Sequence, residues 1–153
     1  MKERHKILFK QLETYREDVL FVLNGITPEL AEIVPNYFHS NIRWTMGHIY
    51  LDQYLWIEAL TKEKTEAPDV FRKWFGYGTK PDNFSEDTPS FAELKELLRQ
   101  QPVRLKEIYG HRLEEEYPPT EMGMRTIEQV LIRTIFHEGM HLQAINDIKK
   151  CLQ

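Results

Sequence analysis

The chain has a single cysteine, Cys151, so no disulfide can form within it. Small secreted domains usually depend on several disulfides, whereas proteins of reducing compartments do without them. The chain also lacks any apolar run long enough for a signal peptide or a membrane-spanning helix. Together these absences predict a cytoplasmic protein that has no membrane partner.

An excess of positive charge is missing as well. Lys and Arg number 20 against 24 Asp and Glu, which gives a formal net charge of -4. Proteins that bind nucleic acid usually present a basic surface, so this composition predicts no nucleic-acid partner. With 153 residues, of which 41% are hydrophobic, the chain can bury a sizeable core. We therefore expect one domain over residues 1–153.

Apolar residues recur at intervals of three and four in four long segments, which is typical of amphipathic helices. The four segments are 3–23, 41–60, 90–108 and 126–149. Ser40, Ser90 and Thr126 stand where their side chains can cap the second, third and fourth helices. No segment alternates convincingly like a strand. The pattern predicts an all-α four-helix bundle, a fold that builds metal sites from inward side chains on facing helices.

Two features interrupt the helical pattern. Residues 61–89 form a long connection between the second and third helices, rich in proline, glycine and aromatic residues. Long loops in compact domains are usually functional, so we interpret this one either as a packed connection or as a lid over a pocket. Pro102 falls inside the third helical segment and predicts a kink or break near Gln101.

The last helical segment contains the motif His137-Glu138-Gly139-Met140-His141. Residues four apart lie on the same face of a helix, so His137 and His141 point the same way, among residues that should face the core. Two imidazoles placed in this way can both coordinate one divalent metal ion. A third ligand must then come from another part of the fold.

Four other histidines are available, and one of them has a helical placement that suits a ligand. His48 lies within the second helix, with Trp44, Asp52 and Leu55 on the same face, and Gly47 beside it indicates a close backbone approach there. Taken alone, His48 can also be a buried histidine satisfied by one hydrogen bond. His5 and His111 lie among polar and charged residues and are expected to be solvated. His39 precedes the helix and has no helical placement to hold it.

These residues resemble the DinB/YfiT-like family, and the similarity covers nearly the whole chain. The resemblance rests on the helix order and on three motifs: Thr27-Pro28-Glu29-Leu30, Asn41…Trp44…Gly47-His48-Ile49 and His137-Glu138-x-x-His141. It implies a four-helix bundle, often dimeric, with a divalent metal ion bound by His48, His137 and His141. Family members often continue the last histidine with Gly-Gln, whereas Leu142-Gln143-Ala144 follows here, so the subfamily stays open.

The resemblance also implies a thiol-dependent activity, because some relatives are enzymes that use bacillithiol, mycothiol or glutathione. Three neutral imidazoles with open coordination positions are typical of a catalytic site. We expect a metal-dependent S-transferase that joins a low-molecular-weight thiol to a small electrophile. A metal-dependent hydrolase and a non-enzymatic metal-binding or stress-response module are the alternatives. Zinc is the expected metal and nickel the alternative. A metalloprotease is disfavoured, because such enzymes take their third ligand from downstream of the HExxH motif.

Two acidic residues are candidates for a catalytic or supporting role. Glu138 can be a general base, an acceptor for a ligating histidine, or a solvated acid. Asp52, four residues after His48, is a better candidate for orienting an imidazole, and its alternative is an ordinary ion pair. Arg43 and Arg133 are candidates for binding a substrate carboxylate, with surface placement as the alternative.

Overall fold

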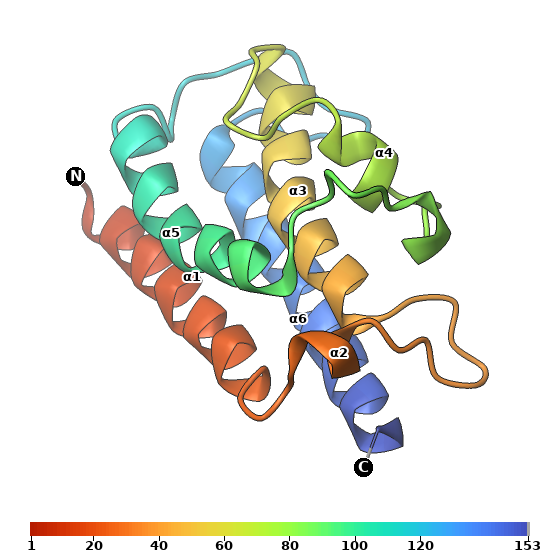
Figure 1. Cartoon of the computed structure of the whole chain (residues 1–153). Helices are drawn as coiled ribbons and strands as arrows, with labels where there is room; N and C mark the ends of the chain where they lie inside the picture. The colour runs from red at the N-terminus through yellow and green to blue at the C-terminus, as the bar shows by residue number, and fades with distance from the viewer. Residues whose placement is uncertain (153) are drawn as a thin grey trace.

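The computed structural model describes residues 1–152 and contains only helices and loops over that range. Four long helices dominate it, so the all-α prediction is confirmed (Figure 1). The long helices are α1 (Glu3–Val22), α3 (Ile42–Thr61), α5 (Phe91–Tyr109) and α6 (Ile127–Cys151). The short ones are α2 (Pro28–Ala31), α4 (Phe71–Phe75) and the 3-10 turn η1 (Pro81–Asn83).

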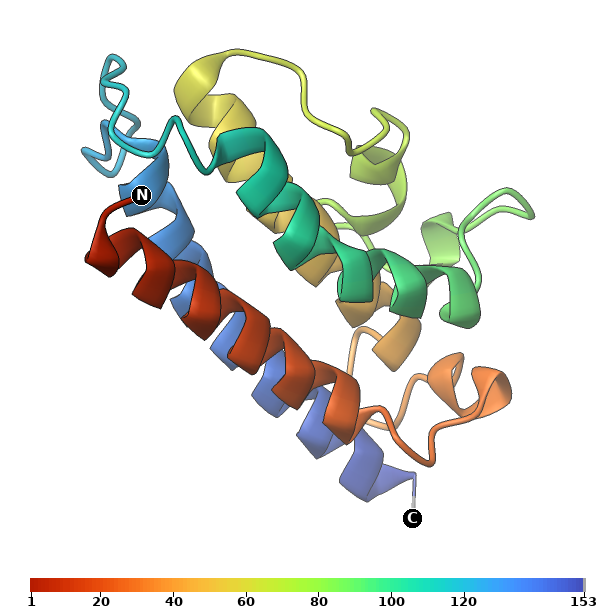
Figure 2. The same ribbon diagram turned by 90° about the vertical axis from the view of Figure 1, so that its left-hand side faces the viewer.

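The direction of the helices explains the long loop. In Figure 2, α1 and α6 run side by side in the same direction, whereas α3 and α5 run the opposite way. Contacts at both ends agree with this: His5 lies against Glu128 near the two helix starts, and Lys149 donates to the carbonyl of Val22 near the two helix ends. Since α3 and α5 point the same way, the chain between them must return along the bundle, about 30 Å for a 20-residue helix.

This returning segment is packed on the bundle. Three of its aromatic side chains, Phe71, Trp74 and Phe75, are buried. They belong to α4, a short helix that the sequence pattern did not reveal, and α4 packs against α3. Around α4, the long loop between α3 and α5 is therefore a packed connection, which is one of the two interpretations drawn from the sequence.

Gly47 allows α4 to approach α3. A Cβ atom at this position would overlap the ring of Phe75, which is completely buried and has no room to move. Gly47 is thus a point of close approach, and the group that lies against its backbone is an aromatic side chain of the loop.

We expect Gly47→Ala to lower the free energy of unfolding by about 1–3 kcal/mol, because the added methyl group overpacks the core. This loss exceeds the roughly 1 kcal/mol that alanine gains as a better helix former. Chemical denaturation measures it. Gly139→Ala in α6 is the matched control, since a Cβ there meets no atom within 4 Å and should stabilise the protein. A stabilised Gly47→Ala variant would contradict the close packing.

The helix caps agree with the sequence except at α3. Ser90 and Thr126 accept hydrogen bonds from backbone N–H groups three residues on, as expected. The cap of α3 is Asn41, whose side chain accepts from the N–H of Trp44 at 2.8 Å. The prediction of Ser40 was wrong by one residue, because Ser and Asn both suit this position and only the backbone direction decides between them.

Pro102 does not break α5, which continues from Phe91 to Tyr109. Proline has no N–H, so the carbonyl of Leu98 one turn earlier loses its usual helical partner. Arg16 of α1 replaces that partner and donates from Nη1 to the Leu98 oxygen at 2.8 Å. Of the predicted kink or break, the break is therefore wrong and the kink stays a prediction. The proline leaves a buried acceptor that another helix uses.

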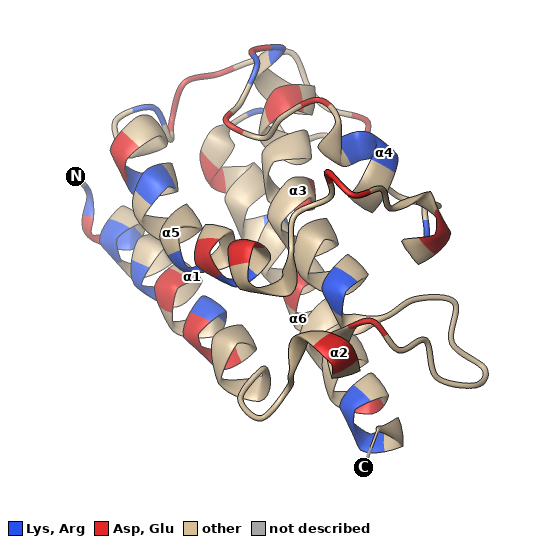
Figure 3. Ribbon diagram, in the orientation of Figure 1, with Lys and Arg blue, Asp and Glu red and all other residues tan. Residues whose placement is uncertain are grey.

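Charges of both signs are interspersed along the helices in the view of Figure 3, with no large basic region. None of the helices in residues 1–152 combines the length and the apolar character that crossing a membrane requires.

Candidate metal centre

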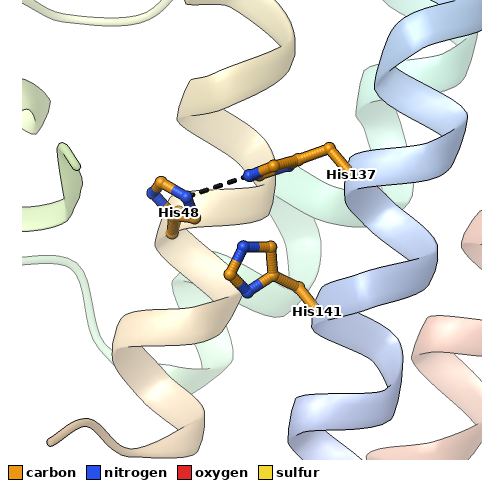
Figure 4. Close-up of side chains that lie close together, drawn as sticks. All are labelled: His48, His137 and His141. Atoms are coloured by element: carbon orange, nitrogen blue, oxygen red, sulfur yellow. Dashed lines mark hydrogen bonds between the residues drawn. The ribbon is translucent and has the colours of Figure 1, made fainter.

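Three histidines from two neighbouring helices converge inside the bundle. His48 comes from α3, and His137 and His141 come from α6 (Figure 4). One nitrogen of each ring lies within 4.8 Å of the other two. His48 and His137 are buried, whereas His141 is partly exposed and lies on the solvent side of the group. The structure thus brings together the three residues that the sequence nominated.

The spacing of the nitrogens suits a metal ion. The Nε2 atoms of His48 and His137 are 3.1 Å apart. Two imidazole nitrogens bound to one tetrahedral zinc ion, each at about 2.0–2.1 Å, are separated by about 3.3 Å. The observed distance is within a few tenths of an ångström of that value, so the donor set fits a small divalent cation.

The ring of His48 is fixed from its other side. Its Nδ1–H donates to the carbonyl oxygen of Phe75 at 2.7 Å, which leaves the lone pair on Nε2 facing the other histidines. Trp44 stacks on the same ring, with centroids 4.6 Å apart and planes inclined by 13°. Trp44 is held in turn by a hydrogen bond from Nε1 to Thr79. The long loop therefore orients His48, a role that neither interpretation of the loop from sequence had included.

The three imidazoles are neutral at pH 7. Burial lowers the pKa of His137 to about 3, with the two neighbouring histidines and Arg133 acting in the same direction. Burial likewise lowers the pKa of His141 to about 4, and it lowers the pKa of His48. Neutral imidazole is the form that binds a metal ion, so the group needs no deprotonation to do so.

Comparison with family models matches residues 11–145 to the DinB superfamily. The chain belongs to the DinB superfamily. This membership agrees with the resemblance of the motifs and with the helical fold. No protein with a curated function matches the chain significantly.

Asp52 lies beside a histidine of this DinB-superfamily site. That histidine is His137 of α6 and not His48, which precedes Asp52 by four residues on α3. Its Oδ2 atom lies 3.0 Å from Nδ1 of His137 and 3.8 Å from the guanidinium of Arg133. The contact with His137 departs from the direction of a well-aligned hydrogen bond, and no other described residue bonds this buried oxygen. Burial raises the pKa of Asp52 to about 6. Since Asp52 shares a helix face with His48, it meets the facing helix α6.

We expect Asp52→Asn to weaken metal binding about 10- to 100-fold, the usual cost of removing a carboxylate partner from a ligating histidine. Competition with a chelator of known affinity measures the change. Glu58→Gln is the control, because Glu58 lies on the same helix and pairs with Arg72, away from the histidines. Equal affinities in the two variants would show that Asp52 does not act on His137.

Glu138 faces away from the three histidines. It is buried, with 6% of its side chain exposed, and forms an ion pair with Arg16 of α1. One residue along a helix turns the side chain by about 100°, so His137 faces α3 while Glu138 faces α1. The interpretation as a solvated acid is therefore wrong. The contacts of Glu138 lie with Arg16, and its role as a base or as an acceptor at the histidines stays a prediction.

Arg43 and Arg133 have structural contacts. Arg43 donates to the carbonyls of Thr88 and Pro89 and pairs with Glu32, so it fastens the end of the long loop. Arg133 lies over the ring of Trp56, with its central carbon 4.7 Å from the ring centroid. Both are partly buried, so neither is a simple surface residue.

The prediction that His5 is solvated was wrong. His5 is 5% exposed, and its Nε2 lies 3.1 Å from Glu128. Glu114 joins them in a second group with metal-ligand atoms within 4.8 Å of one another. Arg4 already pairs with both carboxylates and Lys2 pairs with Glu114, so this group is an ion-pair network with two cations facing its two carboxylates. His111 is exposed, which confirms the expectation for it, and His39 is exposed too.

A cavity of about 530 Å³ opens on the other side of Asp52. Its wall includes Leu55 and Trp56 from α3, Lys62 just after that helix, and residues 119–121 from the loop before α6. This volume falls within the usual range for small-molecule pockets. Asp52 lines this cavity and also contacts His137, so the cavity and the metal centre share one side chain.

Proposed function

We propose that this DinB-superfamily protein is a metal-dependent enzyme whose ion is held by His48, His137 and His141. The observation that carries the proposal is the convergence of three neutral imidazoles, two of which present Nε2 atoms 3.1 Å apart. Three protein ligands leave coordination positions open, which is typical of catalytic sites. A divalent ion bound there would lower the pKa of a water or thiol ligand and would polarise an electrophile.

Within this function, we favour the transfer of a low-molecular-weight thiol to a small electrophile. In such a reaction the thiolate sulfur forms a bond to carbon, and the leaving group departs with its bonding electrons. The resemblance to thiol-dependent relatives supports this choice. The single cysteine also suits a reducing cytoplasm, where such thiols are abundant.

In this proposal three residues around the centre orient or shield its histidines. The Phe75 carbonyl keeps the proton of His48 on Nδ1, so that Nε2 remains a donor. Asp52 increases the basicity of His137 through its contact with Nδ1. The ring of Trp44 covers His48 and keeps water from that side.

Zinc is the metal we expect, with nickel as the alternative. Imidazole nitrogen suits both ions, and the availability of the metal in the cell influences which one is bound. The separation of 3.1 Å between two Nε2 atoms is compatible with tetrahedral coordination and with the slightly shorter separation of octahedral ligands.

A metal-dependent hydrolase is the second candidate, because the same centre can activate water. A metalloprotease is a poorer candidate, since Glu138, the residue expected to act as its general base, is paired with Arg16. A binding module that holds metal without catalysis is the non-enzymatic candidate.

Elemental analysis and a reactivity screen test the proposal together. We expect about one divalent ion per chain, and consumption of model electrophiles only when a thiol is present. Ester hydrolysis without thiol would favour the hydrolase. Bound metal with no reactivity toward a panel of thiols, electrophiles and esters would favour the binding module. Absence of stoichiometric metal would overturn the proposal.

A further inference from the structure

The cavity beside Asp52 is a groove along one face of α3. Its wall takes Asp52, Leu55 and Ala59 from successive turns of that helix, and Lys62 from the position just after it. Lys62 is the tenth residue after Asp52, so the groove is about 15 Å long at a rise of about 1.5 Å per residue. Asp52 also contacts His137, which places one end of the groove next to the metal centre and the other at the end of α3.

The rest of the wall is a loop segment that hydrogen bonds hold in place. Residues 119–121 belong to a turn in which the backbone N–H of Thr120 donates to the carbonyl of Met124 at 2.9 Å. The N–H of Tyr117 donates to the carbonyl of Arg125, also at 2.9 Å. Small-molecule sites are usually formed largely before the ligand arrives, and this wall meets that condition.

The middle of the groove is apolar. The residues that line it are at least partly exposed; they are Leu55, Trp56, Ala59 and Pro119. Arg133 of α6 lies over the indole ring of Trp56, with its central carbon 4.7 Å from the ring centroid, and so helps to fix that ring. Apolar and aromatic side chains that line a pocket in this way bind the hydrocarbon or aromatic part of a small molecule.

The outer end of the groove carries two opposite charges. Lys62 and Glu121 line it, and both are exposed. Within residues 1–152 neither forms an ion pair, whereas Glu63 and Lys64, which follow Lys62, both do. Lys62 has a φ of 62°, a left-handed conformation in which glycine is usual at helix ends. A lysine in this conformation is uncommon and indicates a role for its ammonium group.

We propose that this groove binds a small zwitterion of the amino-acid type that carries a large apolar substituent. The carboxylate of the ligand pairs with Lys62, and its ammonium group pairs with Glu121. The substituent lies on Leu55 and Trp56 and extends toward Asp52. A ligand with a carboxylate alone would bring it beside Glu121, and a ligand with an amine alone would bring it beside Lys62. Like charges placed together cost free energy, so the groove selects a ligand that has both groups.

The proposal names the substrate class of the enzyme, and in that respect it rests on the proposed function. The substituent of the bound ligand ends near Asp52, which lines the groove and contacts His137. An electrophilic group on the substituent would therefore lie on the side of the metal centre that Asp52 occupies. Binding to the groove uses none of the three histidines, so it can be measured separately from metal content.

Three probes with the same aromatic body test the two charges. They are homophenylalanine, phenylbutyrate, which lacks the amine, and phenylpropylamine, which lacks the carboxylate. Titrations followed by the amide NMR signals of the protein measure their dissociation constants. We expect homophenylalanine to bind about threefold to fivefold more tightly than either of the other two, because exposed charge pairs contribute modestly. Lys62→Gln should remove its advantage over phenylpropylamine, and Glu121→Gln its advantage over phenylbutyrate. The matched controls Lys64→Gln and Glu116→Gln, at exposed positions outside the groove, should keep both advantages.

Ala59→Phe tests the place of binding, because the added ring fills the middle of the groove. It should weaken the binding of all three probes about tenfold, whereas Ala92→Phe at an exposed position of α5 should leave it unchanged. A single-charge probe that binds the native protein as tightly as homophenylalanine, or native binding to Ala59→Phe, would overturn the proposal. Metal content is measured in parallel. The expected binding without stoichiometric metal would support the groove while the proposed function fails, and stoichiometric metal with no binding of any probe would overturn the groove alone.

Discussion

His48→Ala is expected to abolish stoichiometric metal binding, although His137 and His141 remain. Four-ligand zinc sites bind with about 10–16 kcal/mol, or about 2.5–4 kcal/mol per ligand, so loss of one ligand weakens binding roughly a hundredfold to a thousandfold. The remaining pair on α6 then competes poorly with a mild chelator. Elemental analysis after dialysis against such a chelator measures the loss, and any thiol-dependent activity should disappear with the metal.

His39→Ala and His111→Ala are the matched controls, because both histidines are exposed and lie outside the centre. They should keep native metal content. Since His48 is buried, the variant must also be shown to be folded, by circular dichroism and a cooperative thermal transition. Full metal content in folded His48→Ala would show that the ion is bound elsewhere, and the proposed function would lose its basis.

The metal centre could be nominated from sequence because local rules determine most of it. The spacing of His137 and His141 places both on one helix face whatever the rest of the fold does. His48 required one more assumption, that its helix faces the last one. The apolar residues around it supplied that assumption, and α3 does pack against α6.

The groups that orient the histidines could not be predicted, because they depend on tertiary contacts. The carbonyl that fixes His48 belongs to Phe75, and a backbone acceptor has no signature in a sequence. Asp52 was expected near an imidazole, but which one depends on how α3 and α6 are aligned along their axes. His5 was expected in solvent because its neighbours are polar, yet packing against the start of α6 buries it.

The same limit explains why sequence rules missed Arg16. A lone arginine in an amphipathic helix usually lies on the solvated face, but Arg16 is 2% exposed. Its guanidinium contacts three other helices. The partners are Glu138 of α6, the Leu98 carbonyl and Gln101 of α5, and Gln53 of α3. Buried charge of this kind must be fully paired to be tolerated.

Arg16 thereby connects all four long helices close to the metal centre. Glu138 adjoins His137 in the sequence, and Gln53 adjoins Asp52. Gln53 also donates to Thr134 of α6, one turn before His137. The network fixes how α6 is rotated against α1 and α3, and this rotation decides whether His137 and His141 point toward His48.

Arg16→Met is therefore expected to lower the free energy of unfolding by about 3–5 kcal/mol, since it leaves the Glu138 carboxylate buried without a partner. Chemical denaturation of the metal-free protein measures this loss. The double variant Arg16→Met/Glu138→Leu removes both charges and should recover a large part of the stability. It will not recover all of it, because the Leu98 carbonyl remains without a donor.

Arg99→Met is the control for the loss of a charged side chain, because Arg99 is half exposed and pairs with Glu96 one turn away on α5. Its effect should stay below about 1 kcal/mol. If Arg16→Met were as mild as Arg99→Met, the buried pair would not be what holds α1 to α6. If the double variant were less stable than Arg16→Met alone, the cost would come from lost packing, and an uncompensated charge on Glu138 would not be its cause.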